Sequence, residues 1–147
     1  SQARLKRVSI RMAALLVLVV AFVLALTPGS KRDVWTAFAP HDFAERLGQE
    51  AMLVDFTADW CPNCKFLEQT TLTDANVHAW QEEYGVTPIQ VDLTEPFPQA
   101  EALLESLGSQ SIPLLAVFPK GDQALRPLVL RDMVTSSQVE QVLETLE

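Results

Sequence analysis

Two cysteines stand only two residues apart in this chain, as Cys61 and Cys64 in the stretch TADWCPNCKFLE. Just before them runs AMLVDFTA, an apolar segment of strand length that is rich in β-branched and aromatic residues. After them, Phe66, Leu67 and Leu72 follow a helical pattern. The pair is therefore predicted to lie where a buried strand passes into a helix, and any fold for this chain has to provide that junction.

Helical and strand patterns alternate along the rest of the chain. The order predicts an α/β fold with βαβ units, a parallel central sheet and a closing antiparallel hairpin. We expect Asp42 to cap the first helix, Thr73 or Asp74 to cap the third, and Gly85 to end the third. Helices are expected over 39–50, from Pro62 to about 72, and over 73–85, 96–108 and 136–147; strands over 51–58, 86–93, 112–118 and 125–130, with a tight turn at 119–122.

Three kinds of chemistry use a closely spaced cysteine pair. A structural zinc site needs four ligands, and His41 and His78, the two histidines, do not stand at the spacing of a zinc knuckle. A permanent disulfide between residues three apart closes a very small loop and removes little chain entropy. A reversible redox couple needs a nucleophilic thiol and a second thiol within reach, which this spacing supplies.

The redox interpretation assigns a role to each sulfur. Cys61 is placed at the mouth of a helix that begins near Pro62, where unpaired N–H groups and the helix dipole stabilise a thiolate. Cys64, one turn further, is placed to attack a mixed disulfide on Cys61 and to release the partner. We therefore expect Cys61 to be the exposed nucleophile and Cys64 the buried resolving thiol.

The N-terminus has a different composition from the rest of the chain. Residues 1–32 carry a net charge of +6, whereas residues 33–147 carry −14, giving the total of −8. The acidic body argues against nucleic acid as a partner, because phosphate binding needs clustered basic residues. An uninterrupted apolar run, MAALLVLVVAFVLAL, follows the basic head.

This apolar run predicts one transmembrane helix over residues 12–27, with a cleavable signal peptide as the alternative. Four basic residues precede the run and two follow it, which places the N-terminus in the cytoplasm and the remainder outside. Because residue 1 is Ser and not Met, we also expect the chain to be a piece of a longer one.

The stretches LVDFTADWCPNCK, VDLT and SIPLL, together with the lead-in VWTAF, resemble the thioredoxin superfamily. Within it, the chain is most similar to the C-terminal periplasmic domain of the DsbD family of transmembrane electron transporters. The likeness runs from about Trp35 to the C-terminus, and the apolar run would match the last membrane span before that domain. It implies a thioredoxin fold, a central mixed β-sheet flanked by helices, preceded here by one transmembrane helix.

The resemblance also implies roles for single residues. Pro113 is expected to be cis and to face the cysteine pair. Asp55 matches the buried acid of thioredoxins, and Glu68 matches a second acid of this subfamily. Two positions depart from the family pattern: the cysteines enclose Pro-Asn, and Ser111 stands where the usual glycine precedes the proline loop.

The two acids also have a physical role that does not depend on the family. A carboxylate near Cys61 disfavours the thiolate and raises the pKa of the thiol, and it can take the proton when Cys64 is activated. The catalytic set is thus Cys61, Cys64, Asp55, Glu68 and Pro113. Substrate contacts are assigned to Trp60, Pro62, Asn63 and Ile112; Trp35, Trp80 and Phe118 to packing; and Lys65 to a solvated helix face.

These observations predict a membrane-tethered periplasmic thiol-disulfide oxidoreductase of the bacterial inner membrane. It would reduce disulfides of exported proteins through its dithiol, with no cofactor or metal, and would be recharged by a membrane electron donor or by a missing part of its own chain. The alternatives are a tethered reductase for cytochrome c maturation and a non-catalytic thioredoxin-fold binding module or chaperone. The predicted parts are a basic cytoplasmic flank (1–11), the membrane helix (12–27), a linker (28–38) and the thioredoxin-like domain (39–147).

Overall fold

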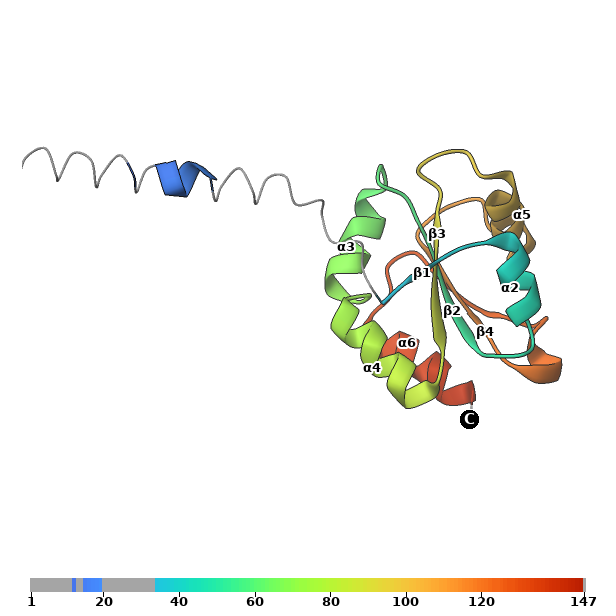
Figure 1. The fold of residues 1–147 in the computed structure, drawn as a ribbon. Helices are drawn as coiled ribbons and strands as arrows, with labels where there is room; N and C mark the ends of the chain where they lie inside the picture. The colour runs from blue at the N-terminus through green and yellow to red at the C-terminus, as the bar shows by residue number, and fades with distance from the viewer. Residues whose placement is uncertain (1–11, 13–14, 20–33, 147) are drawn as a thin grey trace, which may run out of the picture. The chain divides into compact units, whose positions relative to one another are not determined.

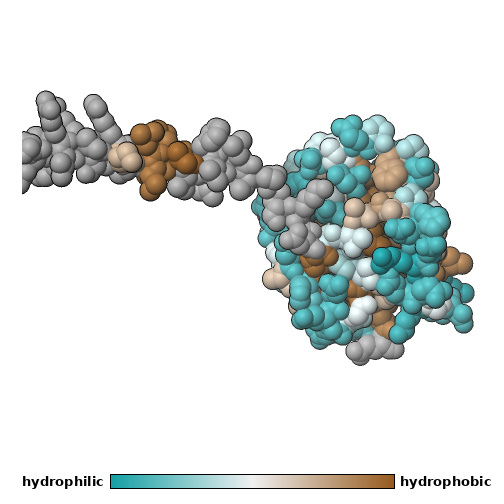
Figure 2. All heavy atoms as spheres, viewed as in Figure 1, coloured by the Kyte–Doolittle hydropathy of each residue, from teal (hydrophilic) through white to brown (hydrophobic). Residues whose placement is uncertain are grey.

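The computed structural model describes Met12, residues 15–19 and residues 34–146. Residues 33–147 form one compact unit and residues 1–32 another. In the unit formed by residues 1–32, Met12 and residues 15–19 are helical, with exposed apolar side chains that are brown in Figure 2. Within the described residues, no helix is long and apolar enough to cross a membrane. Most of the predicted span, 12–27, lies outside the described residues.

Residues 34–146 fold into a five-stranded sheet with helices on both faces (Figure 1). The strands are β1 (Thr36–Ala37), β2 (Met52–Thr57), β3 (Thr87–Asp92), β4 (Leu114–Phe118) and β5 (Leu128–Arg131). The helices are α2 (Pro40–Arg46), α3 (Pro62–Thr70), α4 (Asp74–Tyr84), α5 (Pro98–Ser106) and α6 (Ser136–Leu143), with short 3-10 helices η1 (Gly121–Gln123) and η2 (Glu144–Leu146).

The sheet is mixed, in the order β1-β3-β2-β4-β5. β1 and β2 lie parallel to β3 on its two sides, and β4 runs antiparallel to both β2 and β5. The prediction of a mixed sheet flanked by helices is confirmed. β1 was not predicted: it falls in the expected linker 28–38, and buried Trp35 before it packs in the core, so the folded part begins before residue 39.

The side chains of β2 point alternately to the two faces of the sheet, and the core is divided into two layers. Leu53 faces α3, α4 and α6 in one apolar cluster, while Met52, Val54 and Phe56 face α2 and α5 in the other. Because side chains alternate between the faces of a strand, Asp55 and Thr57 lie on the face of Leu53, beneath α3. The strand register thereby brings a buried acid and a buried hydroxyl to the helix that carries the cysteines.

Of the three residues predicted from the sequence to cap or end a helix, the structure confirms two. The side chain of Thr73 accepts a hydrogen bond from the backbone N–H of Asn76, a cap that typically contributes about 1 kcal/mol. Gly85 ends α4 with φ of +65°, a left-handed conformation that glycine adopts without steric cost. Asp42 does not cap α2: Pro40 occupies the first turn, the cap position is Ala39, and Asp42 lies inside the helix.

The segment after β4 differs from the predicted tight turn at 119–122. Gly121–Gln123 form η1 instead, and the connection to β5 is longer than a hairpin turn. The three aromatic residues predicted to pack, Trp35, Trp80 and Phe118, are all buried. The face of this unit shown in Figure 2 is mostly hydrophilic, as its acidic composition leads us to expect.

Candidate functional site

The cysteine pair lies where β2 passes into α3. Cys61 occupies the N-cap position with extended backbone angles (φ −97°, ψ 102°), and Pro62 stands in the first turn, where its missing N–H removes no helical hydrogen bond. The backbone N–H of Cys64 points at Cys61 and donates to its Sγ at 3.2 Å. The two sulfurs are joined as a disulfide, so the pair is in its oxidised state.

Both sulfur-bearing residues are buried, which corrects the expectation of an exposed Cys61. The exposed fraction is 5% for Cys61 and 2% for Cys64. The reason is local packing: the pair forms a small apolar cluster with Ala58, against which Leu93 and Ile112 pack. In the disulfide state the two cysteines therefore have similar exposure. They differ in position, because Cys61 caps the helix and Cys64 lies inside it.

The loop before β4 lies against this cluster. The peptide bond between Ile112 and Pro113 is cis, as the resemblance implied, and Ile112 packs on the cluster of the cysteines. Pro113 is buried, and its carbonyl oxygen accepts a hydrogen bond from the backbone N–H of Asp132 at 3.2 Å. Ser111 is held as well, since its backbone N–H donates to Oγ of Ser109.

The remaining residues assigned to substrate contact surround the pair at the surface. Trp60, directly before Cys61, keeps 64% of its surface exposed, and Pro62 and Asn63 are exposed on the first turn of α3. Trp60 is thus neither a core residue nor a member of the apolar cluster around the sulfurs. An exposed aromatic ring next to a reactive pair is available to a docking protein.

Asp55 is buried in the middle of β2, with 1% of its surface exposed. Its Oδ2 accepts a hydrogen bond from Nε2 of Gln90, the residue opposite it on β3, at 3.4 Å. A carboxyl group in the interior is usually paired or functional. The structure therefore places Asp55 inside the domain, on the face of the sheet that α3 covers.

Glu68 lies on α3 one turn after Cys64. Its Oε1 accepts a hydrogen bond of 2.7 Å from the hydroxyl of Thr57, the last residue of β2, and its side chain is only 9% exposed. Residues four apart share a helix face, so Glu68 faces the interior on the same side as Cys64. Sequence reasoning found this acid but not its partner Thr57, which only the tertiary fold supplies.

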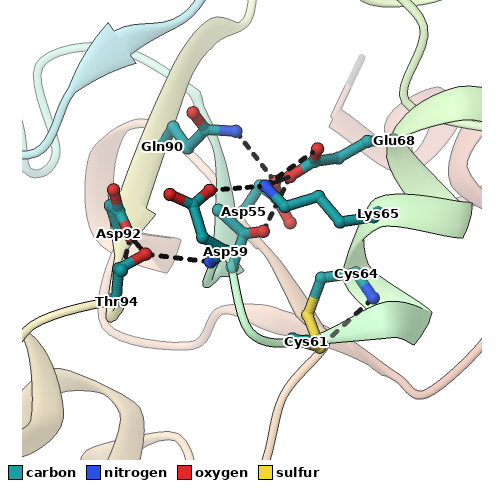
Figure 3. Close-up of polar contacts among 10 residues, drawn as sticks. Asp55, Asp59, Cys61, Cys64, Lys65, Glu68, Gln90, Asp92 and Thr94 are labelled. Atoms are coloured by element: carbon teal, nitrogen blue, oxygen red, sulfur yellow. Dashed lines mark hydrogen bonds and ion pairs between the residues drawn. A yellow bond between two sulfur atoms is a disulfide. The ribbon is translucent and has the colours of Figure 1, made fainter.

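Lys65 is not the solvated helix residue that we expected. Its Nζ lies 3.1 Å from Oδ1 of Asp59 and 3.3 Å from Oε2 of Glu68, and Figure 3 shows the three side chains meeting beside the cysteine pair. Partial burial lowers the pKa of Lys65, but the hydrogen bond to Asp59 and the charge of Glu68 outweigh it, so that the pKa is raised. The Lys65–Glu68 spacing of three was the sequence signal for one of these contacts.

Asp59 links this cluster to the loop after β3. Its backbone N–H donates to Oγ1 of Thr94 at 2.9 Å, and Thr94 in turn hydrogen-bonds Oδ1 of Asp92 (Figure 3). The segment that leads into Cys61 is thus held from both sides, by Thr94 on one and by Lys65 on the other. The sequence left Asp59 open between a functional acid and a plain surface acid, and it gave no signal for the contact with Thr94.

This arrangement is suited to thiol-disulfide exchange. A sulfur at a helix N-terminus, with a backbone N–H directed at it, is favoured as a thiolate. The second sulfur lies within bonding distance and can resolve a mixed disulfide. Acids beneath the helix oppose the thiolate and offer a place for a proton, so the reactivity of the pair is set by opposing influences.

Comparison with known proteins agrees with the geometry. The family model described as Thioredoxin matches residues 34–144. The thiol:disulfide interchange protein DsbD 1 of Pseudomonas aeruginosa is 34% identical over 101 residues, which cover 66% of this chain and 17% of that protein. The chain therefore spans less than a fifth of the length of this curated relative.

Solved structures give the same result. The oxidised C-terminal domain of Neisseria meningitidis DsbD superposes with a TM-score of 0.54 at 25% identity, over 74% of this chain and 89% of that domain. A thioredoxin from Halobacterium salinarum superposes with a TM-score of 0.57 at 19% identity, over 81% and 95% of the two chains, and supports the fold. The chain is thus a thioredoxin-fold domain similar to the C-terminal domain of DsbD.

Proposed function

The chain belongs to the thioredoxin family, and from this premise we propose that it is a membrane-tethered periplasmic disulfide reductase. The family and the likeness to the DsbD C-terminal domain make it a thioredoxin-like disulfide oxidoreductase. The observation that carries the proposal is the Cys61–Cys64 disulfide at the start of α3, with the backbone N–H of Cys64 directed at Cys61.

In the proposed cycle the reduced pair attacks a disulfide of an exported protein. The Cys61 thiolate forms a mixed disulfide with one substrate sulfur, and the other substrate sulfur leaves as a thiolate that takes up a proton. Cys64 then loses its proton and attacks Cys61, which closes the Cys61–Cys64 disulfide and releases the second substrate thiol. Two electrons pass to the substrate, and a dithiol donor at the membrane returns two to the chain; no dissociable cofactor is required.

The other site residues have supporting roles in this proposal. Asp55 and Glu68 provide carboxylates beneath α3, able to accept the proton that Cys64 gives up. Ile112 packs on the cluster of the cysteines, and the loop with its cis bond to Pro113 would offer backbone to an extended substrate segment. Trp60, Pro62 and Asn63 supply exposed surface for docking. The small apolar cluster around the pair keeps water from the reacting sulfurs.

Activity is tested with the whole 147-residue chain in detergent. After reduction by a chemical dithiol and removal of the excess, the chain is mixed with a disulfide-bonded protein, and free thiols on both proteins are counted. We expect one substrate disulfide to be reduced for each Cys61–Cys64 pair oxidised, and none with Cys61→Ser. Binding of the substrate without loss of the dithiol would instead indicate a binding module.

The proposed location rests on charge and hydropathy at the N-terminus. Four basic residues precede the apolar run and two follow it, which favours residues 33–147 on the non-cytoplasmic side. Because the chain has only two cysteines, a membrane-impermeant thiol reagent reports on the site alone. In intact cells after mild reduction we expect labelling that the Cys61→Ser/Cys64→Ser chain loses; labelling that requires lysis would refute the location.

A further inference from the structure

The cluster formed by Asp59, Lys65 and Glu68 is not explained by the exchange reaction itself. Lys65 is the one cation among the polar residues that Figure 3 labels around the cysteine pair, where four carboxylates gather. Of the two lysines in the part of the chain that the structure describes, the other, Lys120, lies after β4, at the opposite end of the sheet from Cys61. Lys65, the residue that follows the resolving cysteine on α3, thus places one positive charge among the carboxylates near the cysteine pair.

Lys65 holds Glu68 in a defined position. One carboxylate oxygen of Glu68, Oε2, lies 3.3 Å from Nζ of Lys65, while Oε1 accepts the hydroxyl of Thr57 at 2.7 Å. The carboxylate is thus bound at both oxygens and is fixed in a largely buried place. Nζ of Lys65 also lies 3.1 Å from Oδ1 of Asp59, and this second ion pair holds the ammonium group in position.

The position of Glu68 matters for the sulfurs. Glu68 follows Cys64 by four residues and shares its face of α3, so its charge acts on the pair at short range. A carboxylate without compensation would disfavour formation of a thiolate. The ammonium group of Lys65, bound to that carboxylate, compensates part of its charge and helps to hold it next to Thr57.

We propose that Lys65 is a positioning residue for this reaction: by fixing and compensating Glu68, it makes the nucleophilic thiolate of Cys61 easier to form. The inference rests on the proposed function, because it takes Cys61 as the nucleophile. The charged groups that face Lys65 are Glu68, which lies on α3, and Asp59, which lies in the segment before α3. Asp55 lies on β2, below the helix. The raised pKa of Lys65 keeps its ammonium group charged throughout the pH range in which thiols titrate.

The test is the pH profile of Cys61 alkylation by iodoacetamide in the reduced whole chain, with the modified cysteine identified by peptide mass. For Lys65→Met we expect the midpoint to move up by roughly half a pH unit, about threefold slower alkylation at a pH below both midpoints. Methionine preserves the aliphatic stem and is a good helix former, so α3 is retained. Lys65→Arg should keep the original profile, because it can still donate to both acids.

Two further variants separate the possible causes. Lys120→Met removes the same charge at the other end of the sheet and should leave the profile unchanged. In a Glu68→Gln background, the shift caused by Lys65→Met should shrink to less than half. An undiminished shift there would show that Lys65 acts directly on the thiol, and no upward shift in Lys65→Met would overturn the proposal.

These outcomes are distinct from a failure of the proposed function. If the wild-type chain reduces a substrate disulfide but Lys65→Met has an unchanged profile, only the role of Lys65 is wrong. If the wild-type chain consumes no dithiol, the proposed function is wrong, whatever the alkylation profile shows.

Discussion

The hydroxyl of Thr57 donates a 2.7 Å hydrogen bond to the Glu68 carboxylate, so the last residue of β2 is tied to α3 one turn beyond Cys64. Thr57 is 3% exposed, and the bond therefore forms away from water. The contact joins the two elements whose junction carries the cysteine pair. It makes the geometry of the site dependent on the packing of the strand beneath it.

Replacing Thr57 by valine tests the contribution of this hydrogen bond to stability. The change keeps the shape of the side chain and removes the hydroxyl that Glu68 accepts, so we expect the free energy of unfolding to fall by about 1–3 kcal/mol, as for a hydrogen bond to a charged group. Urea unfolding of the oxidised chain measures it. The matched control is Thr70→Val, whose exposed hydroxyl donates to the carbonyl of Phe66 and should change stability by less than half as much.

The two cysteines should behave differently as trapping variants. Cys64→Ser leaves Cys61 at the helix cap without a resolving thiol, so we expect a mixed disulfide with substrate to accumulate. Cys61→Ser leaves only a thiol inside the first turn of α3 and should trap little. Non-reducing electrophoresis after incubation with a disulfide-bonded protein measures both. Equal trapping, or more trapping by Cys61→Ser, would contradict the assignment of Cys61 as the nucleophile.

Most of the fold could be predicted because β2, β3, β4 and the helices have strong periodicity and clear end signals. β1 could not, since two residues with exposed side chains leave no alternation to detect. The burial of Asp55 followed from its place in an apolar strand, and alternation from Leu53 also predicts which face it occupies. The partners of Asp59, Lys65 and Glu68 could not be predicted in full, because Thr57 and Thr94 reach them only through tertiary contacts.

The burial of Cys61 could not be predicted from the sequence, for a different reason. A helix N-terminus predicts where a thiolate is stabilised, but it does not predict what covers the sulfur. In this chain the cover comes from Ile112, some fifty residues away in the sequence, and from Leu93 after β3. Exposure of the nucleophile thus depends on loops that local pattern does not describe.

The ion pairs of Lys65 should give stability with a defined pH dependence. Its pKa in the folded chain is raised above the ordinary value of 10.5, so its contribution is fully present below that pH and is lost as the pH rises through the folded value. We expect the difference in unfolding free energy between wild type and Lys65→Met to be less than about 1 kcal/mol, because the side chain is partly exposed, and to vanish in alkali. A difference that grows with pH above 10.5 would contradict this assignment.

The last prediction concerns the acids beneath α3. Asp55 and Glu68 are expected to raise the pKa of the Cys61 thiol, whereas the helix N-terminus lowers it. The acids should therefore make the reduced pair react slowly with disulfides other than those of its substrates. Asp55→Asn and Glu68→Gln should each lower that pKa, and the double variant should lower it further. Asparagine at 55 can still accept from Gln90, which preserves the strand pairing around it.

Titration of the thiolate by its ultraviolet absorbance measures the effect in the reduced whole chain. The matched control is Asp122→Asn, which removes an acid in η1, after β4 and at the end of the sheet opposite to the cysteines, and should leave the titration unchanged. Asp55→Asn removes a buried carboxylate on β2 and leaves the two ion pairs of Lys65, with Asp59 and Glu68, in the chain. If neither Asp55→Asn nor Glu68→Gln lowers the pKa of Cys61, the acids do not act on the thiol, and the proton that Cys64 releases has to go to another acceptor.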